Sequence, residues 1–113
     1  MRNFIARGDV LTLPNSLARA VASGEGVLID RIFGVSANNF SATDDLVINL
    51  VGVFELPKVP SQAWTVGQRV YWDSTNRHVT GTATGNTVIG VAVAAVGGSA
   101  GETLGRVRLN GSF

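Results

Sequence analysis

The sequence predicts an all-β fold, namely a single small partly open barrel or sandwich of about seven short strands. The 113 residues include 16 valines and nine threonines, whose branched side chains favour strands over helices. Fourteen glycines interrupt the chain at the spacing of tight turns. The apolar runs between these turns are short, so little room remains for a helix.

The expected strands follow one another along the chain, and Gly, Pro, Asn or Asp residues bound each of them. In order, they cover residues 10–13, 27–33, 46–55, 69–72, 78–82, 87–94 and 103–109. Seven short strands in so few residues are typical of a compact barrel or sandwich. We therefore divide the chain into an N-terminal arm, residues 1–8, and a single β domain, residues 9–113.

Two segments carry more specific local signals. Residues 68–80 form an alternating run that reaches an Asp/Ser/Thr/Asn turn and returns, which predicts a β-hairpin. Residues 17–22 fit either a strand or one face of a short helix, with a cap at residue 15 or 16 and a stop at Gly24. We favour the strand for this second segment.

Glycine precedes valine inside three apolar runs, at Gly34, Gly52 and Gly90. A glycine within a strand gives up side-chain packing and marks a bulge, a corner or a close backbone approach. Three of them predict a strongly bent sheet. Alternating apolar positions predict the core residues, which are Trp64, Val70, Trp72, Val79, Val88, Val91 and Val93.

The composition excludes several functional classes. A hydrophobic fraction of 45% with 15% charged residues is apolar for so small a protein, so we expect part of its surface to contact another protein. The net charge of +1 disfavours a broad nucleic-acid footprint. The absence of cysteine excludes thiol catalysis, disulfides and thiolate metal sites. We expect neither a membrane span nor a signal peptide, because no apolar run is long enough for either.

The titratable residues do not form a catalytic or metal-binding pattern. His78 is the single imidazole, so a hydrolase using Ser or Asp would need it as its base, and we expect it to be an exposed strand residue. Asp44 and Asp45 are adjacent, which in an extended chain turns them to opposite faces. The single lysine, Lys58, is far from both glycine-rich loops, so no phosphate-binding loop is expected. The sequence predicts a non-enzyme without cofactor or metal.

An alternative function remains open, a small β-barrel module that binds nucleic acid or a ligand. Its best support is the pair Arg106 and Arg108, which lie on one face of the last strand, with Trp64, Tyr71 and Trp72 as stacking platforms. The interpretation that we favour places the arginines on a solvent or subunit face and at least two of these aromatic residues in the core.

Six segments, taken in order, resemble the capsid cement, or head decoration, proteins of tailed bacteriophages. They are NFIARGD at 3–9, FGV at 33–35, VGVFELPK at 51–58, AWTVGQRVYWD at 63–73, TATGNTVIGVA at 82–92 and GRVRLNG at 105–111. Members of this family are often labelled as recombinases of the RecA/RadA type. This chain lacks the Walker lysine loop, and 113 residues cannot hold an ATPase core, so we reject that label.

The resemblance implies a structural virion protein that binds the outer surface of an assembled phage capsid and stabilises it. It implies a homotrimer at threefold and quasi-threefold positions, with the phage major capsid protein as partner and no nucleic acid or membrane partner. The protein would be made in the bacterial host cytoplasm. Capsid-contact candidates lie in the N-terminal arm, which we expect to add a strand to a capsid subunit: Asn3, Phe4, Ile5 and Arg7. An ordinary first strand of the barrel is the alternative for this segment. Arg106 and Arg108 are the subunit-contact candidates.

Overall fold

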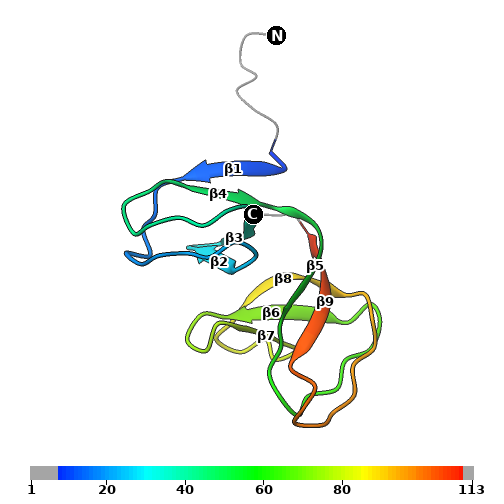
Figure 1. Cartoon of the computed structure of the whole chain (residues 1–113). Helices are drawn as coiled ribbons and strands as arrows, with labels where there is room; N and C mark the ends of the chain where they lie inside the picture. The colour runs from blue at the N-terminus through cyan, green and yellow to red at the C-terminus, as the bar shows by residue number, and fades with distance from the viewer. Residues whose placement is uncertain (1–7, 111–113) are drawn as a thin grey trace, which may run out of the picture.

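The computed structural model describes residues 8–110, which fold into two antiparallel sheets (Figure 1). The first sheet has the strand order β1-β4-β3-β2, with β1 at Val10–Leu13, β2 at Gly26–Ile29, β3 at Ile32–Ser36 and β4 at Leu46–Asn49. The second has the order β5-β9-β8-β6-β7, with β5 at Val51–Pro57, β6 at Arg69–Asp73, β7 at His78–Thr80, β8 at Thr87–Ala92 and β9 at Leu104–Asn110. These residues include no helix, so the predicted all-β class is confirmed.

The second sheet is curled but does not close into a barrel. Its two edge strands approach at one point, where a single parallel bridge joins Lys58, next to the end of β5, to Val79 of β7. The amide of Val59 donates to the carbonyl of Val79 over 2.9 Å at the same place. A closed barrel would need a continuous ladder of hydrogen bonds between these two edge strands, and a single bridge does not provide one. The two sheets together therefore form a sandwich-like fold.

Two predicted strands are each divided in the structure. The predicted strand at 27–33 is the β2–β3 hairpin, which turns at Asp30 and Arg31, and Asp30 has a φ of 55°. The predicted strand at 46–55 breaks at Leu50, where the chain leaves the first sheet for the second. Leu50 is buried, and its amide donates to the carbonyl of Asp9 over 2.9 Å. Apolar residues lie on both sides of each break, so each segment fitted a single strand in sequence.

The predicted strand at 17–22 is wrong, and so is the alternative helix. This segment is irregular apart from one bridge between Val21 and Phe40, whose backbones exchange hydrogen bonds of 2.8 and 2.9 Å. Ala18 has a φ of 57°, a conformation that interrupts both regular structures. By contrast, the hairpin predicted at 68–80 is confirmed as β6 and β7, which pair in antiparallel register.

The buried side chains form two clusters, and β3 contributes to the one beneath the second sheet. The first cluster belongs to the first sheet and its loops, and it includes Val27, Leu46 and Ile48. The second lies under the second sheet but also contains Phe33 and Val35 of β3. The ring of Phe33 lies 4.9 Å from that of Trp72, centroid to centroid. This contact connects the two sheets.

The core prediction is right for four residues and wrong for three. Trp64, Val70, Trp72 and Val79 are buried. Val88 and Val93 are instead 43% and 36% exposed, and Val91 is half-buried.

A β-bulge explains the error at Val88. Val70 pairs with Gly90 and Tyr71 pairs with Val88, so Ile89 is an extra residue on its strand. One extra residue reverses the alternation of side chains, which buries Ile89 and turns Val88 outward.

Gly52 and Gly90 occupy, in different ways, the kinds of position predicted for a glycine within a strand. Gly52 has a φ of 126°, a conformation that side-chain-bearing residues rarely adopt, directly after the chain enters the second sheet. Gly90 lies so close to β9 that a Cβ atom would be 2.0 Å from the carbonyl oxygen of Arg108. Backbone atoms cannot yield as a flexible side chain can, so this position requires glycine.

Gly90→Ala is therefore expected to lower the free energy of unfolding by about 1–3 kcal/mol, because the new methyl group forces β8 and β9 apart. Urea titration followed by tryptophan fluorescence measures this change. Gly101→Ala is the matched control, since a Cβ there meets nothing within 4 Å and its φ is not positive. Equal stability of the two variants would contradict the close approach.

Candidate functional site

The outer face of the second sheet carries the two arginines predicted as contacts. β9 alternates strictly, with Gly105, Val107 and Leu109 buried and the residues between them exposed. Arg106 and Arg108 are therefore exposed side by side on the outer face, as the strand periodicity predicted. Their role as subunit contacts stays a prediction.

Strand register extends this face into a row of alternating valines and arginines. Arg108 pairs with Val53 of β5 on one side and with Val91 of β8 on the other, and Val91 pairs with Arg69 of β6. We call the row Val53, Arg108, Val91 and Arg69, together with Arg106, the Arg–Val face. Val53 is 57% exposed, an unusual position for a large apolar side chain in a folded chain.

The arginines of the Arg–Val face lack acidic partners within the described chain. Among residues 8–110, none of the three forms an ion pair. Glu55 lies opposite Arg106 in the ladder but is not within ion-pair distance of it. The exposed Val53 and the half-buried Val91, beside guanidinium groups without ion-pair partners in residues 8–110, suit an apolar partner surface that carries carboxylates.

The single histidine is not as exposed as predicted. The side chain of His78 is 19% exposed, and its Nε2 lies 3.6 Å from Oδ2 of Asp73. Asp73 accepts three hydrogen bonds, from the amides of Thr75 and Asn76 and from Nδ2 of Asn76, over 3.0, 3.2 and 2.9 Å. These bonds, above all that from the Asn76 side chain, hold the pKa of Asp73 below its usual value. Asp73 therefore shapes the β6–β7 turn, as predicted for a turn-forming residue.

Lys58 has a structural role, because it is 2% exposed. Its Nζ donates to the carbonyls of Val59 and Glu102 over 2.7 and 3.1 Å, and it lies 5.7 Å from the centroid of the Trp64 ring. Burial lowers the pKa of Lys58, and the charge of Glu102 opposes this shift. The ammonium group thus joins two loops that are 44 residues apart in sequence.

The aromatic residues offer little to a nucleic acid. Trp64 and Trp72 are 2% and 3% exposed, as expected for core residues, and Tyr71 is half-buried. Stacking on bases requires an open ring face, so the alternative nucleic-acid module loses its two largest stacking platforms. Within residues 8–110, no group of three His, Cys, Asp or Glu side chains is placed to hold a metal, and no helix is long and apolar enough to cross a membrane.

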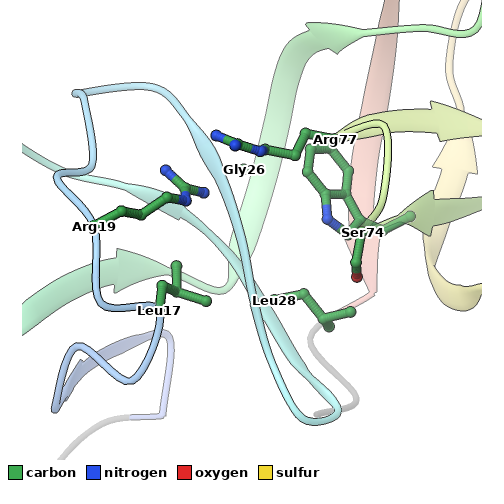
Figure 2. A pocket seen from close by; sticks show the side chains of 7 residues that line it. Leu17, Arg19, Gly26, Leu28, Ser74 and Arg77 are labelled. Atoms are coloured by element: carbon green, nitrogen blue, oxygen red, sulfur yellow. The ribbon is translucent and has the colours of Figure 1, made fainter.

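A small hollow lies where the first sheet meets the β6–β7 turn (Figure 2). It has a volume of about 120 Å³. Arg19 and Arg77 enter it from different segments, the loop before β2 and the β6–β7 turn. The sequence analysis missed this group, because its residues lie far apart in the chain and match no spacing motif.

The predicted capsid-contact residues of the arm, Asn3, Phe4, Ile5 and Arg7, lie outside the described residues. A family model described as phage cement protein matches residues 5–109. The chain belongs to this family. No curated protein and no solved structure matches the chain significantly.

Membership of the cement family confirms the resemblance inferred from the six segments. The match begins at Ile5 and ends at Leu109, so it covers both sheets and part of the predicted arm. It indicates a capsid-associated structural role in a bacteriophage, and it is consistent with a non-enzyme. The exposed surfaces of this cement protein therefore matter more for its function than its single His–Asp pair.

The lowered pKa of Asp73 predicts a specific acid response. The pKa of Asp73 is lower in the folded than in the unfolded protein, so the ionised carboxylate stabilises the fold at any pH above the pKa of the unfolded state. This stabilisation is lost as the pH falls from the pKa of the unfolded state through the pKa of the folded state. Asp73→Asn is expected to lower stability at neutral pH and to make its decline below about pH 4 shallower. Urea titrations over a pH series measure this slope.

Asn76→Ala is the companion variant, since it removes one of the three donors to Asp73. The decline of its free energy of unfolding with falling pH should be intermediate in slope between those of the wild type and Asp73→Asn. Identical acid slopes in all three proteins would contradict the role of these hydrogen bonds.

Proposed function

We propose that this cement protein binds the outer surface of an assembled phage head and stabilises it, with the major capsid protein as its partner. The family match over residues 5–109 is the observation that carries this proposal. The Arg–Val face supports it, since an exposed apolar and cationic surface that has no acidic partner within residues 8–110 suits a protein-bound state.

Binding to the assembled lattice alone is sufficient for stabilisation. A ligand that binds one state and not the other shifts the equilibrium toward the bound state by mass action. When one molecule contacts several capsid subunits, or when several copies are joined in one oligomer, the first contact raises the effective concentration for the next. The binding free energies of the separate contacts then reinforce one another. Weak binding by each copy then gives large stabilisation of the shell, with no catalytic group.

The N-terminal arm is our proposed capsid contact. Phe4 and Ile5 form an apolar pair flanked by arginines ahead of β1, a pattern that suits strand addition to a subunit edge. In the same proposal the chain forms a homotrimer, and Arg106 and Arg108 bond acidic residues of a neighbouring copy. Their exposure and lack of ion-pair partners in the described chain support this role.

Deletion of residues 2–7 is expected to reduce occupancy on empty capsids at least tenfold, because the arm's backbone and apolar contacts are lost. Cosedimentation of the purified protein with capsids measures occupancy, and Gly101→Ala is the control that should bind as wild type. Unchanged occupancy would refute the arm as the contact. Failure of the wild type to bind capsids, with binding to DNA that falls steeply with salt, would favour the nucleic-acid module instead.

Arg106→Glu combined with Arg108→Glu is expected to convert a trimer, three times the 11.8 kDa of the chain, into a monomer. Reversed charges would repel the acidic partners that the proposal assigns to them. Light scattering measures the mass. The double substitution to lysine preserves both charges and should preserve the trimer, whereas a trimer that persists with both glutamates would exclude this interface.

A further inference from the structure

The hollow at the junction of the two sheets has a surplus of hydrogen-bond donors. Leu17 and Leu28 form its apolar walls, and Arg77, Ser74 and Trp72 contribute polar groups from the other side. Neither Arg77 nor the hydroxyl of Ser74 has a hydrogen-bond or ion-pair partner among residues 8–110. Figure 2 shows the side chain of Arg77 extending toward that of Arg19 across the strand that holds Gly26.

The indole of Trp72 is the observation that points to a ligand. Trp72 is 3% exposed, yet its Nε1–H donates to no residue of the described chain, whereas Nε1 of Trp64 donates to Gln62 over 2.9 Å. In residues 8–110, every side-chain nitrogen or oxygen that is completely shielded from solvent has a partner. The Nε1 atom of Trp72 must therefore reach open space, and the hollow is a space that Trp72 lines.

The charge of the hollow comes mainly from Arg77. Arg19 is paired with Glu25 and also donates to the carbonyl of Ala20 over 3.1 Å, so its charge is largely balanced. Asp73, next in sequence to Ser74, accepts its hydrogen bonds from Thr75 and Asn76. Among residues 8–110, no acidic side chain lies within ion-pair distance of the guanidinium of Arg77.

The backbone of Arg77 is itself strained. Its φ is 53°, in the left-handed region that glycine and asparagine adopt most readily. Arg77 is the last residue of the β6–β7 turn, directly before β7. Its side chain is the one that brings the positive charge to the hollow.

We propose that this hollow binds a single carboxylate group. A carboxylate has two acceptor oxygens and no donor, which matches the planar fork of Arg77 and the donors of Trp72 and Ser74. The volume of the hollow is about 120 Å³. It is below the volume of ordinary small-molecule pockets, about 300 Å³ or more, so it accommodates one acidic side chain but no nucleotide or cofactor.

The apolar walls agree with an acidic side chain as the occupant. Leu17 and Leu28 would contact the methylene groups of an Asp or Glu while its carboxylate meets Arg77. We assign this side chain to a capsid subunit, an assignment that rests on the proposed function. A free small carboxylate is the other possible source of the same chemistry.

The two indole signals of the protein allow a direct test by NMR. Sodium acetate, titrated into the free ¹⁵N-labelled protein against sodium chloride of equal ionic strength, should shift the Nε1–H signal of Trp72 in a saturable manner. The signal of Trp64, already bonded to Gln62, is the internal control and should not move. Arg77→Gln should weaken acetate binding roughly tenfold or more, the loss expected for a charge-assisted hydrogen bond.

One further variant and one further anion complete the test. Arg77→Gly should remove acetate binding yet raise the urea midpoint of unfolding, because it relieves the left-handed strain. A loss of binding through misfolding would instead lower that midpoint. No shift of Trp72 with acetate, an unchanged shift in Arg77→Gln, or a shift with inorganic phosphate alone would overturn the carboxylate site.

Cosedimentation with capsids distinguishes the two sources. If the capsid supplies the carboxylate, Arg77→Gln lowers the occupancy measured at protein concentrations that do not saturate the capsid. Unchanged occupancy at these concentrations would overturn the capsid as the source. The acetate titration uses the free protein, so it remains valid if the wild type fails to bind capsids. That failure would overturn the proposed function and leave the carboxylate site standing.

Discussion

The packing of Trp72 against β2 and β3 joins the two sheets, and much of the remaining structure depends on it. The indole lies on the ring of Phe33 and so close to Gly26 that a Cβ there would be 2.8 Å from it. An aromatic pair of this kind contributes about 0.5–1.5 kcal/mol beyond its buried area. Because Trp72 is on β6, the contact also brings the β6–β7 turn, with Ser74 and Arg77, beside the first sheet and so creates the hollow.

The inner face of the second sheet packs against β3, and the outer residues of β9, on its other face, are exposed. Its inner residues, such as Val107 and Leu109, supply the core, and its outer row presents Val53 and Arg108 to the exterior. Such a division suits a cement-family protein, because the same strands both form the core and present an exposed surface. The apolar residues that exceed the needs of the core are then available for contacts with other proteins.

The outer residues of β9 were predictable from sequence, and those of β8 were not. Strict alternation from Leu104 to Asn110 is enough to place Arg106 and Arg108 on one face. In β8 the bulge at Ile89 reverses the alternation, and its position depends on pairing with Val70 and Tyr71, which are about 20 residues away. The hollow was equally inaccessible, since Arg19 and Arg77 are near one another only after the sheets pack. The hairpin turn at Asp73 was predictable because its hydrogen bonds are local.

By itself, the sequence determined the all-β class, the β6–β7 hairpin, two strand positions that require glycine and the family, since these depend on local chemistry and on short motifs in order. Only the tertiary structure decided that the strands form two sheets, that Lys58 is buried against Trp64, and that the indole of Trp72 has no hydrogen-bond partner among residues 8–110. The physical reason is distance along the chain. Packing and hydrogen bonding between remote segments depend on the whole fold, and no periodicity or spacing within one segment encodes them.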